Sequence, residues 1–357
     1  MPPVERLTAG GLTVERCASD DWRWKSYAER SERATFCHLP GWAKVVERVW
    51  KHTPCHLIAS RGDVVTGILP LFHVKSLLFG SSLVSSPNAV YGGVAATDET
   101  TRAALVAEAK VLARRLRVGF LELRDTVEDE GAAADAELQR KDLYATFGCP
   151  ITTDEELLGK QFQRDVRRMV RVGLKNGLVA VVGGEEHLDA FYEVYATSVR
   201  NLGTPVFPKS LFAEFLREFP DSSDILLVRH GNRVASGVLS FYFRSTVMPY
   251  YGGAYPEFYR SGVNNLMYWE LMKSAAARGY TWFDFGRSKK GTGAYAFKHG
   301  WSMEECPLPY RFFLVSAPKM PDLNPNNPKF AMAIKAWKKL PLGLTKIVGP
   351  HLVRSMP

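Results

Sequence analysis

The sequence contains one series of segments twice, with the two copies roughly 160–170 residues apart. Each copy begins with two apolar runs joined by a turn that contains glycine, which is the pattern of a β-hairpin. A Tyr-Gly-Gly strand, a helix and a short strand then follow in the same order. The segments are, first copy before second, 56–72 and 225–243, 91–93 and 251–253, 101–116 and 265–278, and 120–123 and 282–285.

The repeat predicts a fold of two similar halves. Strands that alternate with helices favour an α/β sandwich with a mixed sheet in each half. The chain has 357 residues, which is more than one hydrophobic core usually holds. We therefore expect domains at 10–150 and 151–318, followed by a basic C-terminal tail at 319–357. The tail begins with residues 321–328, whose prolines and asparagines predict a loop.

Composition and charge limit the class of protein. Apolar residues make up 46% of the chain and charged residues 23%, which is typical of a globular protein. The 46 Lys and Arg exceed the 37 Asp and Glu by nine. A net charge of +9 favours an anionic partner, which leaves open a nucleic acid, a phosphate-bearing substrate or a membrane surface.

The sequence has no recognisable targeting, disulfide or metal pattern. Its first 21 residues lack the apolar segment of a secretory signal, and no run reaches the roughly 18 apolar residues of a membrane span. We therefore expect a cytoplasmic protein, with peripheral contact at the inner membrane as an open alternative. The five cysteines have no CxxC spacing and the eight histidines no ligand spacing, so we expect reduced thiols and no metal site.

Longer motifs resemble the FemAB family, and most closely its members encoded with exosortase/PEP-CTERM and exopolysaccharide systems. The strongest motif is FDFGRSKKGTG at 283–293, followed by Phe297-Lys298. The others are Phe36-x5-Trp42, Gly67-x-Leu69-Pro70-Leu71, Tyr91-Gly92-Gly93, Arg167-x3-Arg171-x-Gly173-x-Lys175-Asn176-Gly177-Leu178, NLGTPV at 201–206 and Asn324-Pro325-x2-Pro328-Lys329. The resemblance covers nearly the whole chain.

The resemblance implies an α/β fold of two tandem GNAT-like N-acyltransferase domains with mixed sheets. It also implies transfer of an acyl or aminoacyl group to an amine of a cell-envelope or exopolysaccharide precursor. The donor would be acyl-CoA or aminoacyl-tRNA, and no cofactor would be permanently bound. The substrate cleft would lie between or beside the halves, mainly on the second. The chain lacks the long heptad arm of some tRNA-using members, so tRNA is one of two donor alternatives.

The stretch 284–298 is the strongest candidate for an active site. Acyl transfer develops negative charge on the carbonyl oxygen, which cations and hydrogen-bond donors stabilise. Four cations lie here with three glycines, which let backbone N–H groups approach a phosphate. Lys298 matches the lysine that the family uses as an electrostatic helper. We assign catalysis to Lys298 and Asp284, and substrate binding to Arg287, Lys289, Lys290 and Tyr295. The alternatives are a flexible basic loop and, for Asp284, a structural carboxylate.

Three other segments provide candidate residues. Tyr251 would be a general acid, with a packed core tyrosine as the alternative. The turn before the second-half helix would bind a cofactor pyrophosphate at the helix N-terminus through Arg260, Gly262, Asn264 and Asn265. The alternative is a helix cap made by one of the two asparagines. Residues 160–175 predict an amphipathic helix on which Arg168 and Arg171 would contact phosphate or nucleic acid, unless this face is merely solvated.

The C-terminal segment 329–354 contains six cations and no acidic residue. Phe330, Ile334 and Trp337 would share one helical face, which is typical of a helix at a membrane surface. The alternative is a helix that packs on the first half, and Pro341, Gly343 and Pro350 should keep any helix here short.

Two functions from different classes fit these features. The first is an acyl- or aminoacyltransferase that needs neither a covalent nucleophile nor a metal, since the chain has no GxSxG motif and no obvious Cys–His pair. The second is a non-catalytic binding or scaffold protein of the same envelope pathway. The intact cationic stretch at 286–298 favours the enzyme, and the absence of an evident general base keeps the second function open.

Overall fold

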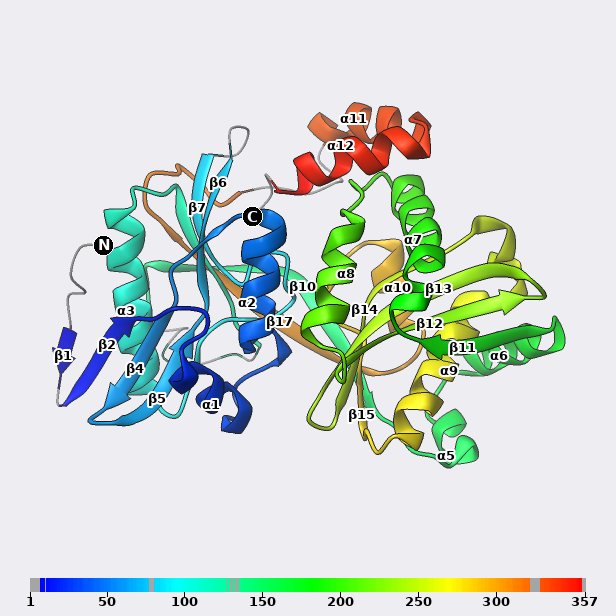
Figure 1. Ribbon diagram of the computed structural model, residues 1–357, viewed down its shortest axis with the longest axis horizontal. Coiled ribbons are helices and arrows are strands. Elements are labelled where there is room, and N and C mark those ends of the chain that lie inside the picture. Colours follow the sequence, from blue (N-terminus) through cyan, green and yellow to red (C-terminus); the bar gives the residue numbers. More distant parts are fainter. Residues whose placement is uncertain are drawn as a thin grey trace. The chain divides into compact units, whose positions relative to one another are not determined.

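The computed structural model describes residues 7–9, 11–76, 80–126, 128, 131, 135–321 and 328–354 (Figure 1). The described chain forms two compact units. Unit 1 holds the residues up to Tyr144 together with 307–321 and Arg354, and unit 2 holds Ala145–Cys306 and 328–353. Residues 307–318, which the sequence placed in the second half, therefore pack with unit 1.

Unit 1 combines two sheets with one long helix. Its helices are α1 (Trp22–Arg30), α2 (Pro40–Val45) and α3 (Glu99–Arg115), with the short turns η1 (Phe36–His38) and η2 (Val46–Trp50). Its strands are β1 (Leu7–Ala9), β2 (Leu12–Arg16), β3 (Thr53–Pro54), β4 (Leu57–Arg61), β5 (Val64–Leu69), β6 (Leu71–Ser76), β7 (Gly80–Ser85), β8 (Ala95–Ala96) and β9 (Phe120–Arg124). Strand β17 (Glu304–Leu314) adds residues 310–314 beside β9.

Pro70 explains why unit 1 has two sheets rather than one. It lies between β5 and β6 and has no N–H to donate to a ladder. Strand β5 pairs with β4 and β8 in the sheet β1-β2-β4-β5-β8, whereas β6 pairs with β7 and β3. Helix α3 then connects β7 to β9, and these two strands are parallel.

Unit 2 is built on one mixed sheet. Its helices are α5 (Glu155–Lys160), α6 (Arg164–Lys175), α7 (Leu188–Leu202), α8 (Lys209–Glu218), α9 (Val263–Ala277), α10 (Gly293–His299), α11 (Pro328–Lys339) and α12 (Leu342–Arg354), with the turns η3 (Glu185–His187) and η4 (Pro256–Ser261). Its strands are β11 (Leu178–Gly183), β12 (Ser223–His230), β13 (Arg233–Phe243), β14 (Thr246–Ala254), β15 (Trp282–Asp284), β16 (Ser288–Lys289) and the second part of β10 (Leu138–Pro150).

The sheet of unit 2 has the order β11-β12-β13-β14-β15-β10, and only β14 and β15 are parallel. Helix α9 connects these two strands, as α3 connects β7 and β9 in unit 1. The repeat in the sequence is therefore a repeat in structure: a hairpin, then a helix between parallel strands. Helices α6 and α9 belong to the apolar core on one face of the sheet, and α7 and α8 contribute an aromatic cluster on the other.

Three local expectations were wrong. Tyr91–Gly93 form no strand, and β8 begins only at Ala95. The N–H of Gly93 donates to the backbone carbonyl oxygen of Arg124, and the N–H of Val94 donates to the carboxylate of Asp125. The basic helix α6 begins at Arg164 rather than near 160, although Phe162 before it is buried as expected. The N-cap of α9 is Gly262, not either asparagine.

Gly262 allows α9 and α6 to pack closely. Its φ of +79° lies in the left-handed region, and a Cβ added there would lie 2.2 Å from the carbonyl oxygen of Met169. From the other side, Gly173 of α6 packs against Leu266 of α9. The two glycines let the helix backbones approach, and this approach fixes where α9 begins.

Residues 328–353 of the C-terminal segment belong to unit 2, whereas the alternative placed this segment on the first half. The indole N–H of Trp337 donates to the carbonyl of Thr204 at 3.0 Å, and Ile334 packs on Gly203. Gly349 lies against the backbone of Val206. Helix α12 contains Gly343 and continues through Pro350, so these two residues do not shorten it as expected. Phe330 is outside the residues whose side chains are described, as is most of the predicted loop at 321–328.

Replacement of Gly262 by Ala tests the close helix contact. The change adds left-handed strain of about 1–2 kcal/mol and an overlap that costs about 1–3 kcal/mol, so we expect a loss of about 2–5 kcal/mol in the free energy of unfolding. Gly343→Ala is the matched control, because an added Cβ there meets no atom within 4 Å. Urea denaturation measures both variants. Equal stability of the two would contradict the contact.

Candidate functional site

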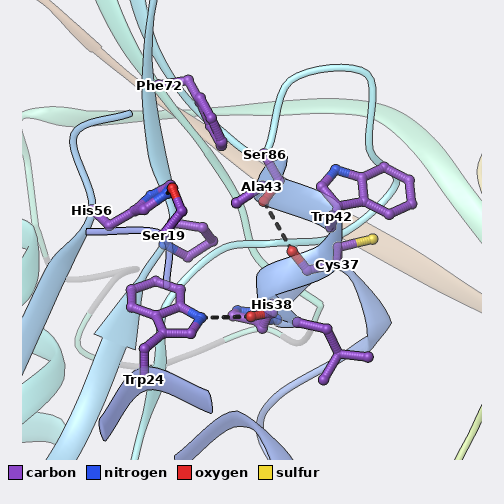
Figure 2. Close-up of a pocket in the computed structure, with 11 residues that line it drawn as sticks. Ser19, Trp24, Cys37, His38, Trp42, Ala43, His56, Phe72 and Ser86 are labelled. Atoms are coloured by element: carbon purple, nitrogen blue, oxygen red, sulfur yellow. Dashed lines mark hydrogen bonds between the residues drawn. The ribbon is translucent and has the colours of Figure 1, made fainter. Parts of the chain in front are cut away.

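Unit 1 contains a pocket whose residues suggest catalysis but are held in a structural network (Figure 2). Nδ1 of His56 accepts the N–H of Leu71, so the neutral ring carries its proton on Nε2, 3.0 Å from Oγ of Ser19. Ser19 in turn donates to the carboxylate of Glu47. Burial lowers the pKa of His56 to about 3. Because Ser19 accepts a hydrogen bond from His56, the histidine does not act as a base that activates the serine hydroxyl. The pocket also has no room for a water-sized molecule.

The sheet of unit 2 has a gap in its strand pairing between β14 and β15, which we call the opening. Strands β14 and β15 pair at only two positions, Thr246 with Trp282 and Val247 with Phe283. Strand β14 continues to Ala254, whereas β15 ends at Asp284. Within the described part of the chain, residues 248–254 pair with β13 alone. The other edge of β14 therefore presents backbone N–H and C=O groups to the opening.

A tight turn borders the opening where β15 ends. Oδ1 of Asp284 accepts two hydrogen bonds, from the N–H of Gly286 at 2.8 Å and from the hydroxyl of Thr146 on β10 at 2.5 Å. The N–H of Phe285 donates to the carbonyl of Phe147 on the same strand. These bonds end β15 and fix the chain direction at Gly286. Asp284 thus has the contacts of a structural carboxylate, which was the alternative to a catalytic role. It lies at the edge of the opening.

Lys298 binds the same turn from helix α10. Its Nζ donates to the carbonyl oxygens of Phe285, Gly286 and Arg287, at 2.6, 3.1 and 3.4 Å. Burial of the ammonium lowers the pKa of Lys298 to about 8, with Asp284 opposing the shift and Arg287 adding to it. Lys298 is therefore not an isolated cation in a loop. It connects α10 to the end of β15.

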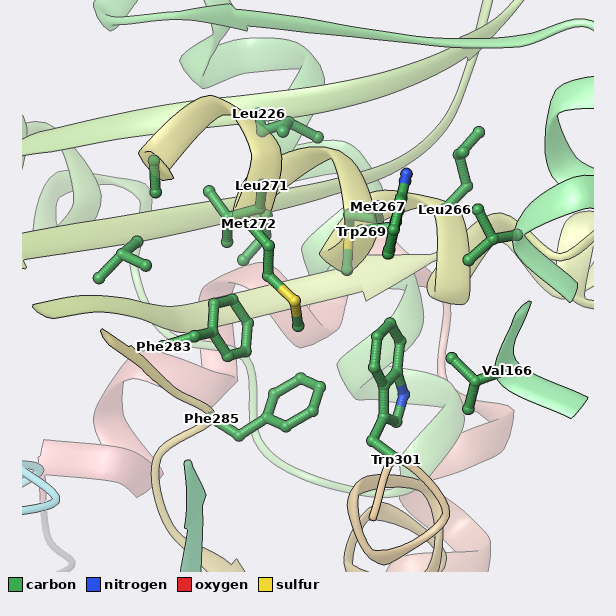
Figure 3. Packing of buried hydrophobic residues seen from close by; sticks show 14 of the residues in the cluster. Val166, Leu226, Leu266, Met267, Trp269, Leu271, Met272, Phe283, Phe285 and Trp301 are labelled. Carbon is green, nitrogen blue, oxygen red and sulfur yellow. The ribbon is translucent and has the colours of Figure 1, made fainter. Parts of the chain in front are cut away.

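Aromatic packing connects this turn to α9. The ring centroid of Phe285 lies 5.7 Å from that of Trp301 (Figure 3). The ring centroid of Phe285 also lies 4.7 Å from that of Tyr268 on α9. The hydroxyl of Tyr268 lies 3.7 Å from the position that a Cβ on Gly252 would occupy. Burial raises the pKa of Tyr268 to about 12. A protonated phenol is thus held beside the part of β14 that borders the opening.

The remaining residues of the 284–298 stretch differ in their surroundings. Arg287, Lys289 and Lys290 are part-exposed, with Lys289 on β16 and the other two beside it. Tyr295 donates to both carboxylate oxygens of Glu305, at 2.9 and 2.8 Å, and this contact raises its pKa. Tyr295 is therefore held on β17.

The predicted pyrophosphate turn lies at the start of α9. Gly262 is buried against α6, Arg260 is exposed, and Asn264 and Asn265 are part-exposed in the first turn. No side chain caps this 15-residue helix. The first N–H groups of a helix and its dipole favour an anion. The structure therefore gives Gly262 a packing role and leaves the other three residues at a helix end that suits a phosphate.

Two sets of predicted residues lie away from the turn. The side chains of Arg168 and Arg171 are exposed on α6, where they bond only within the helix, to Asp165 and to the carbonyl of Arg167. The ring of Tyr251 packs with Phe207, Phe212 and Phe215 on the α7 and α8 face of the sheet. Phe285 and Lys298 belong instead to the core on the α9 face.

The structure adds residues that the sequence did not single out. Thr146 and Glu305 are the partners of Asp284 and Tyr295, and Tyr268 faces Gly252. Thr146 is 138 positions from Asp284 along the chain, and only the pairing of β10 with β15 brings them together. Tyr268 could have been found from its place one turn and a half into the helix after the second YGG strand.

One family model matches part of the chain. Residues 160–299 match the family model described as acetyltransferase (GNAT) domain. This range contains α6, α9, the β14–β15 opening and Lys298. No curated protein sequence matches the chain.

Solved structures show the fold of the whole chain. The crystal structure of FemX is similar, with a TM-score of 0.67 and 15% identity over 90% of this chain and 99% of that one. The C-terminal domain of a putative lysylphosphatidylglycerol synthetase from Agrobacterium fabrum gives 0.56 and 14%, over 81% and 90%. A tandem GNAT protein from the clavulanic acid biosynthesis pathway gives 0.51 and 13%, over 87% and 100%.

The comparisons confirm the predicted fold class, α/β with tandem GNAT-like domains and mixed sheets. They do not confirm the predicted membership of the exosortase/PEP-CTERM subgroup. Residues 160–299 thus match a GNAT acetyltransferase domain, within a fold similar to that of FemX, and at this level the prediction of an acyltransferase is confirmed.

Proposed function

We propose that the chain transfers an acyl or aminoacyl group to an amine of a cell-envelope or exopolysaccharide-related precursor, at the opening between β14 and β15. The observation that carries this proposal is the opening itself. Its β14 edge offers backbone hydrogen-bonding groups, and its β15 edge is a turn fixed by Asp284 and Lys298. Acyl transfer to an amine needs oriented substrates and donors for an oxyanion, and no covalent nucleophile.

The donor would lie along β14. An extended, amide-containing chain, such as that of acyl-CoA, can pair with an open strand edge as an added strand does. Pro249 has no N–H, so the donors in the opening come from the residues after it. The phosphates of the donor would then lie at the start of α9, near Arg260, Asn264 and Asn265. Aminoacyl-tRNA is the second donor class, and the exposed Arg168 and Arg171 of α6 are the cations proposed for its phosphates.

The proposed chemistry assigns a role to each group at the turn. The amine nitrogen attacks the acyl carbon, an N–C bond forms, and the C–S or C–O bond to the donor breaks. N–H groups of β14 stabilise the oxyanion, and the excess proton of the amine passes to the leaving sulfur or oxygen. The phenol of Tyr268 can relay that proton, since its raised pKa keeps it protonated. Lys298 positions the turn, and its charge favours the negative transition state.

The acceptor is proposed to be anionic, lipid-linked or both. Arg287, Lys289 and Lys290 follow the turn that borders the opening and are part-exposed, and we assign them to its phosphate or carboxylate groups. Among similar structures, one is of FemX and another of a putative lysylphosphatidylglycerol synthetase. Their likeness to this chain lies in the fold, and the name of the second, a synthetase of lysylphosphatidylglycerol, supports a lipid-linked acceptor.

The direct test is incubation of the chain with extracted envelope precursors and each donor in turn. A labelled acyl-CoA or a labelled aminoacyl-tRNA should give an amide product that mass spectrometry identifies. Binding of precursor without product from either donor would favour the non-catalytic function instead.

Lys298→Met should lower the stability of unit 2, because three carbonyl oxygens lose their donor; a buried group left without its hydrogen bond costs about 1–3 kcal/mol. The pKa of Lys298 in the fold, about 8, is below its usual 10.5, so the unfolded chain binds more protons between these values. The contribution of Lys298 therefore rises as pH increases from about 8 to about 10.5. Melting at pH 7.5 and 9.5 should show a larger parent-to-variant difference at the higher pH. An unchanged difference would contradict the buried ammonium.

The same variant separates binding from catalysis. If Lys298 acts in the transition state, Lys298→Met should lower kcat by about ten- to a thousand-fold with KM little changed. Lys298→Arg keeps the charge and should recover part of kcat. Steady-state kinetics should be measured well below the melting temperature of each variant. Full activity of Lys298→Met would place the site elsewhere.

Arg260→Gln should raise KM for the donor about five- to tenfold and leave kcat near normal, because the charge contacts a phosphate equally in ground and transition states. The effect should shrink at high salt. Arg217→Gln, an exposed cation on α8, is the control and should behave as the parent. A lowered kcat for Arg260→Gln with constant KM would contradict the assigned role.

A further inference from the structure

The C-terminal helices α11 and α12 form a pair that lies along the outside of unit 2 (Figure 1). The pair is attached at several points. Trp337 bonds to Thr204, the guanidinium of Arg200 bonds to the carbonyl of Leu340 between the helices, and Lys346 forms an ion pair with Glu193 of α7. The inward face of each helix is thus defined by contacts within unit 2.

The outward face of α11 is basic with one apolar side chain. Met332, Lys335 and Lys339 are spaced i, i+3 and i+7, which places them on one side of a helix. This side is opposite Ile334 and Trp337, which pack inward. Met332 is 82% exposed, and both lysines are exposed.

The outward face of α12 is apolar. Thr345, Gly349 and Val353 are buried at i, i+4 and i+8. Leu344 and Ile347 lie on the other side, 43% and 66% exposed. We call Met332, Lys335, Lys339, Leu344 and Ile347 the outer face of the helix pair.

The outer face combines three exposed apolar side chains with a charge of one sign. Residues 328–354 contain six cations and no Asp or Glu. Exposed large apolar side chains beside lysines are typical of helices that lie in a membrane interface, where the apolar atoms enter the headgroup region and the lysines contact anionic lipid. Among the described residues, no helix is long and apolar enough to cross a membrane.

We propose that the outer face of α11 and α12 docks the protein on an anionic lipid surface. Charge complementarity selects this partner over a second copy of the chain, because a symmetric contact would bring the lysines of both copies together. The proposal does not depend on the acyl transfer reaction. It retains the membrane contact expected for 329–354, but assigns it to the side chains opposite Trp337.

The test is sedimentation of the full chain with vesicles of phosphatidylglycerol and phosphatidylcholine in a one-to-three ratio, and with phosphatidylcholine alone. The parent should bind the anionic vesicles at least about tenfold more tightly. Lys335→Gln/Lys339→Gln should lose about 25-fold at about 50 mM salt, since each lysine near the surface contributes about a fivefold factor, and much less at about 500 mM. Leu344→Ser/Ile347→Ser should lose affinity at both salt concentrations.

The matched control is Arg164→Gln/Lys175→Gln, which removes the same charge from the exposed side of α6. It should bind vesicles within about twofold of the parent. Unchanged melting temperatures of all variants would show that the fold is intact. A parent that fails to bind, equal binding to both vesicle types, or a loss in the α6 control as large as in the α11 variant would overturn the proposal.

Discussion

The short pairing of β14 and β15 is the constraint on which the proposed site depends. A strand edge with unpaired N–H and C=O groups tends to acquire a partner, and β15 is the strand in position to extend along β14. The turn at Gly286 prevents this. Asp284 at the end of β15 and Thr146 on β10 fix the turn, and Lys298 on α10 donates to its carbonyl oxygens. The opening therefore persists because three separate segments determine the direction of the chain after Asp284.

Helix α9 gives the site its second support. Its N-terminus is fixed by the contact between Gly262 and α6, and Tyr268 follows Gly262 by six residues. At 1.5 Å per residue, these two positions are about 9 Å apart along the axis. In the proposed site, one helix thus supplies both the end assigned to the phosphate and the phenol assigned to proton relay. Substrate orientation in such a site follows from the packing of the helix and not from a mobile loop.

The sequence predicted the parts of the fold that depend on local pattern. The hairpins, the helices and the short strands after them are visible because their periodicity is local. The break at Pro70 was readable in principle, but the resulting division into two sheets depends on pairing partners far along the chain. The inward packing of the C-terminal helices depends on small residues, Gly203 and Gly349, whose partners no local pattern reveals.

The candidate site was predictable only in part, for the same reason. The stretch 284–298 was found from its cations and glycines and from its resemblance to a known family. The roles of its residues were not, since Thr146 lies 138 positions from Asp284 and no pattern in the sequence pairs Glu305 with Tyr295, although the two are 10 residues apart. Tyr251 was chosen because it lies on the second YGG strand, beside the presumed cleft, yet strand alternation and a bulge opposite Leu239 and Ser240 place its ring on the α7 and α8 face. Tyr268 lies on the other face, with its hydroxyl near Gly252.

Hydrogen–deuterium exchange of the β14 amides tests the central claim most directly. The chain would be measured alone, with coenzyme A, and with an adenosine that carries an amide-linked amino acid in place of the reactive ester. The account predicts that one of these two donors binds. Its binding should slow the exchange of backbone amides within residues 250–254 and in the first turn of α9. Binding with protection confined to other segments, or no binding of either donor, would contradict it.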